Sequence, residues 1–322
     1  MSQWIWISWE KHRRTQCLSA DLGIRLFEKS IDLPRWIKHP YLLLWTLQVL
    51  IRNRPSGVVV QNPSVVLGAW AVLLKRVFRY VLVVDAHNEG IAPFLPRWSR
   101  LYFIYRFIQR GAELTIVTNS RLAETVERQG GSPFVLEDKL PAFPIGKGMD
   151  LEGKVNIVCI STFAKDEPYR EVIEASRMLV GHCHIYMTGN FRKIPGIQTD
   201  RLPSNLTLTG YLSNGDYIML LRSADIILDL TYMDDCLVCG AYEAVSSEKP
   251  VILTDTAALR NYFHQGTVFT RNTAQEISEA VRLAISQLPS LREDVKALKK
   301  GLEIQWAARR NELVSRLSSL VH

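Results

Sequence analysis

Short apolar runs alternate with helical patterns along the whole chain of 322 residues. The runs are nearly continuous in apolar character, which is typical of parallel strands in a sheet that helices cover on both faces. The first half contains predicted strands at residues 4–8, 23–27, 57–61, 80–86 and 114–119. The second half contains predicted strands at 155–161, 184–189, 206–210, 224–230, 250–255 and 267–270. The alternation predicts an α/β fold with two Rossmann-like domains.

The passage between the two halves, residues 140–154, is rich in proline and glycine and has the composition of a linker. We therefore predict an N-terminal domain over 1–150 and a C-terminal domain over 151–302. The last helix, 303–322, has apolar residues at amphipathic spacing, so we expect it to pack rather than to extend into solvent. These residues are Trp306, Leu313, Leu317 and Leu320.

The charge is distributed unevenly between the halves. Residues 1–150 contain 20 Lys and Arg against 12 Asp and Glu, a balance of +8, whereas residues 151–322 contain 19 against 20. A basic half suits an anionic membrane surface, a pyrophosphate-bearing substrate or nucleic acid, although a solvated cationic face would give the same count.

Two aromatic segments favour contact with a membrane surface. Residues 34–54 and 94–110 interleave Trp, Tyr and Phe with Arg and Lys, as amphipathic segments at a lipid surface do. Burial of both helices against the sheet would explain the apolar content equally well. The longest apolar stretch, 41–51, is too short to span a bilayer, and the amino terminus lacks a signal-peptide pattern. We expect a cytoplasmic protein, peripheral on the inner face of the cytoplasmic membrane.

The cysteines and glycines exclude several site classes. The five cysteines are scattered, and neither Cys236-x-x-Cys239 nor the sequence His-Cys-His at 182–184 has a second cysteine pair to complete a zinc site. We therefore expect reduced thiols and no metal. No G-x-G-x-x-G follows a predicted strand, which argues against a bound NAD or FAD.

Ligands of parallel sheets bind beyond the carboxyl ends of the strands. In the second half this places the candidate ligand loops at 161–168, 188–190, 210–217, 231–243 and 254–260.

One of these loops carries a family resemblance. DCLVCGAYEAVSSEKPVILTD, residues 235–255, resembles the E-x7-E region of GT-B glycosyltransferases of the family 4 type, and the preceding GYLSNGDYIMLLRSADIILDLT resembles the segment before it. The loops QNPS (61–64), VVDAHNEG (83–90) and STFAKDEP (161–168) are similar to those of cytosolic beta-mannosyltransferases that build dolichol-linked N-glycan precursors. The resemblance implies two Rossmann-like domains facing across a cleft, with the last helix packing back on the N-terminal domain.

The resemblance also implies roles in binding a nucleotide-sugar donor. Glu243 would accept hydrogen bonds from ribose hydroxyls, and Asp235 would contact the donor sugar or, alternatively, cap the following helix. Backbone amides of the loop would face the diphosphate. The remaining candidate donor-binding residues are Ser161, Thr162, Lys165, Tyr211, Leu237, Val238, Cys239 and Gly240.

In the first half, His87 follows a strand and is the candidate that activates or orients the acceptor hydroxyl, with Asp85 or Glu89 assisting. The alternative is a loop histidine bonded to backbone. The helix start near residue 13 could hold an acceptor pyrophosphate. The candidate acceptor-binding residues are Glu10, His12, Arg13, Asn88 and Glu89.

Together these features predict a nucleotide-sugar-dependent hexosyltransferase. It would extend a lipid-linked or surface polysaccharide precursor at the cytoplasmic membrane face, without a metal or other cofactor. A sugar-nucleotide epimerase on the same fold is one alternative, and a basic nucleic-acid-binding protein is another. The sequence leaves open the donor sugar and base, the acceptor and the stereochemistry.

Overall fold

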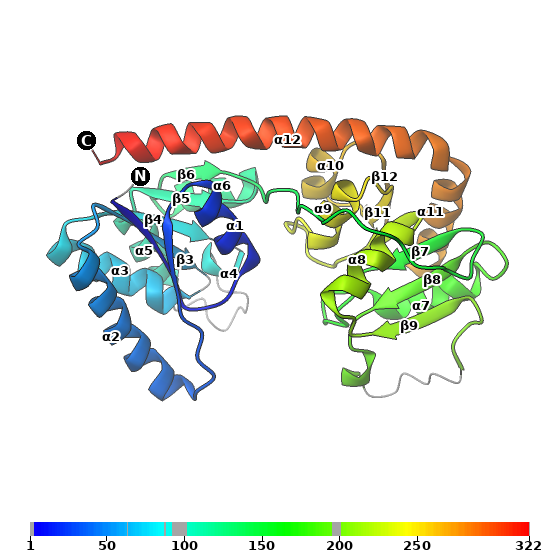
Figure 1. The fold of residues 1–322 in the computed structure, drawn as a ribbon, viewed down its shortest axis with the longest axis horizontal. Helices are drawn as coiled ribbons and strands as arrows, with labels where there is room; N and C mark the ends of the chain where they lie inside the picture. Colours follow the sequence, from blue (N-terminus) through cyan, green and yellow to red (C-terminus); the bar gives the residue numbers. More distant parts are fainter. Residues whose placement is uncertain (1–2, 63, 87, 92–101, 195–200, 322) are drawn as a thin grey trace. The chain divides into compact units, whose positions relative to one another are not determined.

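A computed structural model describes residues 3–62, 64–86, 88–91, 102–194 and 201–321. The chain divides into two compact units. The first unit comprises Met1–Lys139 and Gln305–His322, and the second comprises Leu140–Ile304. Each unit contains one six-stranded parallel sheet with helices around it (Figure 1). The α/β class predicted from the apolar pattern is confirmed.

The first unit has the strand order β2-β1-β3-β4-β5-β6. Its strands are β1 (Trp4–Ser8), β2 (Arg25–Glu28), β3 (Gly57–Asn62), β4 (Val81–Ala86), β5 (Leu114–Val117) and β6 (Pro133–Val135). Its helices are α1 (Arg13–Asp21), α2 (Arg35–Asn53), α3 (Val65–Phe78), α4 (Asn88–Ile91), α5 (Tyr102–Gly111) and α6 (Ser120–Arg128).

The alternation of side chains along these strands builds two apolar layers. On one face of the sheet Ile7, Val60 and Leu82 join a core with buried residues of α2, α3 and α5. On the other face Trp6 and Val59 join a second core that includes α1. Since both faces are covered, the strands are apolar at nearly every position.

The second unit has the strand order β12-β11-β10-β7-β8-β9. Its strands are β7 (Asn156–Cys159), β8 (His184–Thr188), β9 (Leu206–Gly210), β10 (Ile226–Asp229), β11 (Val251–Thr254) and β12 (Thr267–Thr270). Its helices are α7 (Tyr169–Arg177), the 3-10 turn η2 (Phe191–Lys193), α8 (Asn214–Ser223), α9 (Cys239–Ser246), α10 (Ala257–Tyr262) and α11 (Ala274–Ser286).

The last helix, α12 (Leu288–Ser319), belongs to both units. Its first half buries Val295, Leu298 and Leu302 in a core of the second unit. Its second half buries Leu313 and Leu317 in the first unit. The helix therefore begins well before residue 303, where the sequence pattern placed its start.

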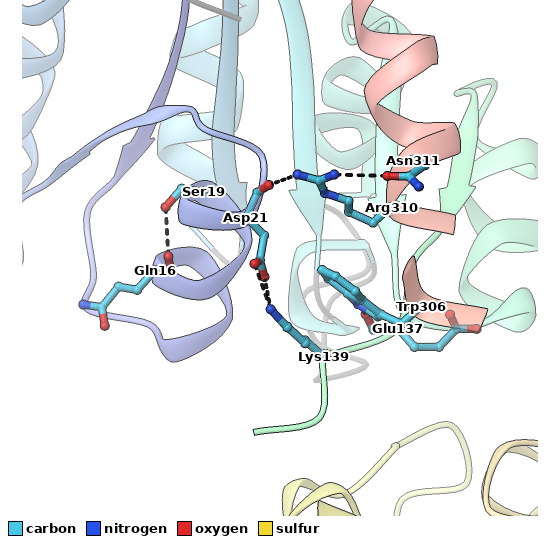
Figure 2. Close-up of polar contacts among 8 residues, drawn as sticks. All are labelled: Gln16, Ser19, Asp21, Glu137, Lys139, Trp306, Arg310 and Asn311. Atoms are coloured by element: carbon cyan, nitrogen blue, oxygen red, sulfur yellow. Dashed lines mark hydrogen bonds and ion pairs between the residues drawn. The ribbon is translucent and has the colours of Figure 1, made fainter. Parts of the chain in front are cut away.

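Polar contacts hold the second half of α12 on the first unit (Figure 2). The Arg310 guanidinium donates to the backbone oxygen of Asp21, whose carboxylate accepts from Lys139 Nζ at 2.8 Å. Trp306 Nε1 donates to the Glu137 oxygen at 3.1 Å. The Lys139 ammonium also lies 5.1 Å from the Trp306 ring centroid. The chain thus leaves the first unit at Lys139 and re-enters it beside the same residue.

The passage after Lys139 packs on the second unit. The Pro141 oxygen accepts a hydrogen bond from Ser246 Oγ, and the Met149 amide donates to Ser223 Oγ at 2.6 Å. The boundary between the compact units therefore precedes residue 150, because these contacts assign the proline- and glycine-rich passage to the second unit. Among the described residues, no helix combines the length and the apolar character needed to cross a bilayer.

Candidate functional site

The candidate site of the second unit lies where the strand order reverses. β7 and β10 are neighbours in the sheet, but the chain continues from them toward opposite sheet edges. Such a switch point leaves a crevice beyond the carboxyl ends of the two strands, where α/β sheets bind ligands. The loops that follow β7 and β10 contain most of the donor-binding residues predicted from the sequence.

The loop after β7 is closed around the carboxylate of Glu167. This carboxylate accepts hydrogen bonds from Ser161 Oγ at 2.6 Å and from Thr162 Oγ1 at 2.7 Å. It also accepts from the backbone amides of Thr162 at 2.8 Å and Ala164 at 3.3 Å. The loop is bent by buried Phe163, whose φ of 59° is in the left-handed region. Ser161 and Thr162 are thus held by an acidic residue that the sequence reading did not select, while Lys165 is exposed.

The end of β10 supplies a second carboxylate, that of Asp229, to the start of α9. Asp229 is 8% exposed, and the backbone amides of Gly240 and Ala241 donate to it. A Cβ at Gly240 would lie 2.4 Å from Asp229 Oδ2, so only glycine allows this approach. The N-cap residue of α9 is Val238, whose side chain cannot cap a helix, and Asp229 takes over that role from the neighbouring strand.

The pKa of Asp229 is raised from 3.8 to about 8, chiefly by burial; the charges of Glu167 and Glu243 also raise it, and the amides of Gly240 and Ala241 partly offset the rise. Asp229 is therefore mostly a neutral acid at pH 7. Sequence reading missed this residue, although an acid at the end of the apolar run 224–230 is the signal that could have identified it.

Glu243 lies on α9, one helical turn beyond Gly240. Its carboxylate accepts a hydrogen bond of 2.5 Å from the Tyr217 hydroxyl on α8. Burial, followed by the charge of Glu243, raises the pKa of Tyr217, so this phenol stays protonated and remains a donor. The structure thus orients Glu243 through a neighbour that sequence reasoning did not select.

The other predicted donor-binding residues lie along the same edge of the sheet. Asp235 and Leu237 are half-buried in the segment before α9, Val238 is buried, and Cys239 is exposed at the first position of the helix. Tyr211 directly follows β9 and is 88% exposed. Its ring is available to a ligand at this edge.

The first unit has a buried ionic cluster at the carboxyl edge of its sheet. Arg14, on α1, donates to Asp85 Oδ1 on β4 at 3.1 Å, to Asp138, and to the Leu136 oxygen at 2.9 Å. Burial alone would lower the pKa of Arg14, but the charges of Asp85 and Asp138 outweigh it and raise the pKa. The cluster joins three segments of the chain at the edge where the acceptor residues were predicted.

The predicted acceptor residues are placed differently from Arg14. Glu10 and Arg13 are exposed, and His12 is the N-cap residue of α1, without a capping bond from its side chain. Asn88 and Glu89 belong to α4, but their side chains lie outside the described part of the structure. His87 lies outside the described residues altogether, so its predicted catalytic role stays a prediction.

Neither a metal cluster nor a disulfide is found in the part of the chain that the structure describes. No group of three His, Cys, Asp or Glu side chains there could hold a metal ion. All five cysteines are free thiols. Burial raises the pKa of Cys159 well above its usual value, as expected for an inert thiol in the core of the sheet.

The fold is similar to that of several solved structures. Sucrose-phosphate synthase from Thermosynechococcus elongatus matches with a TM-score of 0.78 at 12% identity, over 99% of both chains. Anabaena HepE in complex with UDP matches with a TM-score of 0.73 at 12% identity, over 98% of this chain and 100% of HepE. A protein named as a UDP-N-acetylglucosamine 2-epimerase from Listeria monocytogenes matches with a TM-score of 0.61 at 12% identity, over 91% and 90%.

No protein-family model and no curated protein matches the sequence. The structural likeness extends over nearly the whole chain, but at these identities it concerns the fold alone. The chain has the two-domain GT-B fold found in these glycosyltransferases.

Proposed function

We propose that the protein is a glycosyltransferase that uses a nucleotide-sugar donor. The observation that carries the proposal is the position of Glu243, which Tyr217 orients at the switch point of the second sheet within a GT-B fold. Among the structures with this fold, HepE was solved with UDP and with UDP-glucose. We also propose that the protein is related to the family 4 enzymes and to the beta-mannosyltransferases that its loops resemble.

In this proposal Glu243 accepts hydrogen bonds from the ribose hydroxyls of the donor, since an ionised carboxylate is a strong acceptor. Asp235 and the segment Leu237–Gly240 contact the donor sugar and the diphosphate, except for the Gly240 amide, which donates to Asp229. Ser161, Thr162 and Lys165 meet the leaving group from the loop after β7. Lys165 is the residue among them that can offset the charge developing on the nucleotide diphosphate.

We further propose that the acceptor is a lipid-linked glycan precursor and that the protein acts at the cytoplasmic face of a membrane. The exposed side of α2 supports this part. Trp36 is 77% exposed, Leu44 63% and Ile51 52%, and Arg35 and Arg52 lie on the same helix. Aromatic and apolar side chains beside basic ones are typical of helices that lie on an anionic lipid surface.

The epimerase alternative has one observation in its favour, the match to the Listeria protein. That match has a lower TM-score than those to sucrose-phosphate synthase and HepE. The two activities differ in their products, because an epimerase converts the nucleotide sugar alone and a transferase needs an acceptor.

The test is calorimetric binding of UDP and GDP to the wild type and to Glu243→Gln, with Glu174→Gln as the matched control. Glu174 is an exposed carboxylate on α7, where it pairs with Arg177. Loss of charge-assisted hydrogen bonds at Glu243 should weaken nucleotide binding by about 1.5–3 kcal/mol, or roughly 10- to 150-fold. The control should bind like the wild type. If all three proteins bind the nucleotides with equal affinity, Glu243 is not part of the nucleotide site. The proposal then loses its main support.

A further inference from the structure

A basic groove lies on the first unit between α3 and α5. Its volume is about 610 Å³, and its lining includes Val72, Lys75, Arg76, Arg79, Phe107 and Arg110. It reaches Val81 at the start of β4 and Glu113 just before β5. These are the amino ends of the strands, so the groove is at the sheet edge opposite the Arg14 cluster.

The groove carries an excess of positive charge. Its four cations face one carboxylate, Glu113, which is already bonded by Lys75 Nζ and by the Leu82 amide at 2.8 Å. Arg110 Nε donates to the Gln129 oxygen at 3.3 Å. Within the described residues no acidic side chain pairs with the guanidinium group of Arg76 or Arg79. Each of these groups offers five donors in a planar fork, which suits the oxygens of a phosphate.

Arg79 stands at a backbone position that favours glycine. It is the C-cap of α3 and has a φ of 57°, and its amide donates to the Lys75 oxygen at 2.8 Å. A residue with a Cβ is uncommon in this region, where glycine is the usual choice at a helix end. Tyr80, the next residue, is buried and its hydroxyl donates to the Ala71 oxygen at 2.6 Å. The fixed backbone places an arginine side chain at the groove in spite of the conformational cost.

Cations at helix C-termini also offset the helix dipole, and Lys75, Arg76 and Arg110 are in the last turns of α3 and α5. This accounts for their charge, but it does not account for the apolar side chains on the same two helices.

Two apolar pairs, each one helical turn apart, are exposed on α3 and α5, the helices that form the groove. Leu73 and Val77 on α3 are 49% and 73% exposed, and Phe103 and Phe107 on α5 are 66% and 36% exposed. Binding of a soluble anion would not bury these apolar side chains. An anionic phospholipid offers both a phosphate for the arginines and acyl chains for the apolar pairs.

We propose that the groove binds the phosphate of an anionic phospholipid headgroup while the apolar pairs enter the lipid surface. The site extends the membrane contact proposed for α2. It is independent of the donor chemistry, because no residue of the groove belongs to the candidate donor site in the second unit.

The experiment is flotation of the full-length chain with vesicles of phosphatidylcholine alone or mixed with phosphatidylglycerol, at low salt. The variants are Arg76→Gln/Arg79→Gln in the groove and, as a control of equal charge change, Arg121→Gln/Arg128→Gln on α6. All four side chains are exposed, and circular dichroism confirms that each variant is folded. The wild type should bind only the phosphatidylglycerol vesicles. The groove variant should lose about tenfold or more in vesicle affinity, the control less than threefold, and both should bind UDP like the wild type.

Equal losses in the two variants would show that net charge alone attracts the chain, and the groove proposal would fail. It would also fail if the groove variant bound vesicles normally. Inorganic phosphate serves as the soluble probe. If phosphate raises the melting temperature of the wild type but not of the groove variant, and vesicles do not bind, the ligand is a soluble anion and the proposal is overturned. Failure of UDP binding in the wild type would instead contradict the proposed transferase.

Discussion

Replacement of Asp229 by Asn should abolish a large part of the pH dependence of stability in the second unit. In the folded chain burial raises the pKa of Asp229 to about 8, whereas the unfolded chain has the ordinary value of 3.8. Between these two values the folded state holds a proton that the unfolded state has released. Unfolding therefore becomes more favourable as the pH rises, and stability present near pH 4 is lost by pH 8. Asparagine keeps an oxygen that can accept from Gly240 and Ala241 but cannot ionise.

The magnitude follows from the separation of the two pKa values. One proton bound in the folded state alone changes the free energy of unfolding by up to about 1.4 kcal/mol per pH unit. From pH 5 to pH 7.5 this amounts to about 3 kcal/mol for the wild type. Asp229→Asn should therefore be more stable than the wild type at pH 7.5, and the difference should shrink toward pH 5.

The two units can be followed separately in a urea titration. The sequence contains eight tryptophans, all in segments of the first unit. They are Trp4, Trp6, Trp9, Trp36, Trp45, Trp70, Trp98 and Trp306. Tryptophan fluorescence thus reports on the first unit, while far-ultraviolet circular dichroism reports on both units. The effect of Asp229→Asn should be larger in the dichroism transition than in the fluorescence transition.

Asp234→Asn is the matched control, because Asp234 is exposed in the loop that follows β10 in the second unit. It should keep the pH dependence of the wild type. If Asp229→Asn also keeps it between pH 5 and pH 7.5, Asp229 is ionised in the folded chain and the reasoning from burial is refuted.

Three further substitutions test other contacts. Gly240→Ala should lower the free energy of unfolding, measured by urea titration with circular dichroism, by about 1–3 kcal/mol, because its Cβ would collide with Asp229; an unchanged urea midpoint would contradict this. Arg14→Met should destabilise the first unit by about 3–5 kcal/mol, because Asp85 loses its buried partner, and tryptophan fluorescence should detect it. His87→Ala should lower transfer by about 10²- to 10⁴-fold with nearly unchanged UDP affinity. A transfer rate within threefold of the wild type would contradict the catalytic role of His87 and favour a structural one.

The apolar pattern predicted most of the fold because both sheets are covered on both faces. Every predicted strand overlaps a strand of the structure. β6 was missed, since Pro133–Val135 is too short to give a pattern. The start of α12 was misplaced because the prediction rested on the apolar spacing of Trp306, Leu313, Leu317 and Leu320, all in the second half of the helix. The helix begins at Leu288, and Pro289 is compatible with that start because proline in the first turn removes no intrahelical hydrogen bond.

The candidate site was predictable only in part. The rule that ligands bind beyond the carboxyl ends of strands located the loops, and the resemblance selected Glu243. The contact between Asp229 and the start of α9 spans the irregular loop between β10 and α9, whose path the residue spacing does not reveal. The same is true of Arg14, which meets Asp85 and Asp138 only after the sheet has formed.

The neutral state of Asp229 bears on how an anionic donor could bind. At the switch point the amides of Thr162 and Ala164 are taken by Glu167, and those of Gly240 and Ala241 by Asp229. A nucleotide diphosphate at this edge would meet the carboxyl groups of Glu167 and Glu243, and a negative charge on Asp229 would repel it further. A protonated Asp229 removes that charge at neutral pH and still caps α9. The burial of Asp229 lowers the stability of the second unit at neutral pH. Because burial also keeps this carboxyl group uncharged, it reduces the electrostatic repulsion of the anionic donor that the proposed reaction requires.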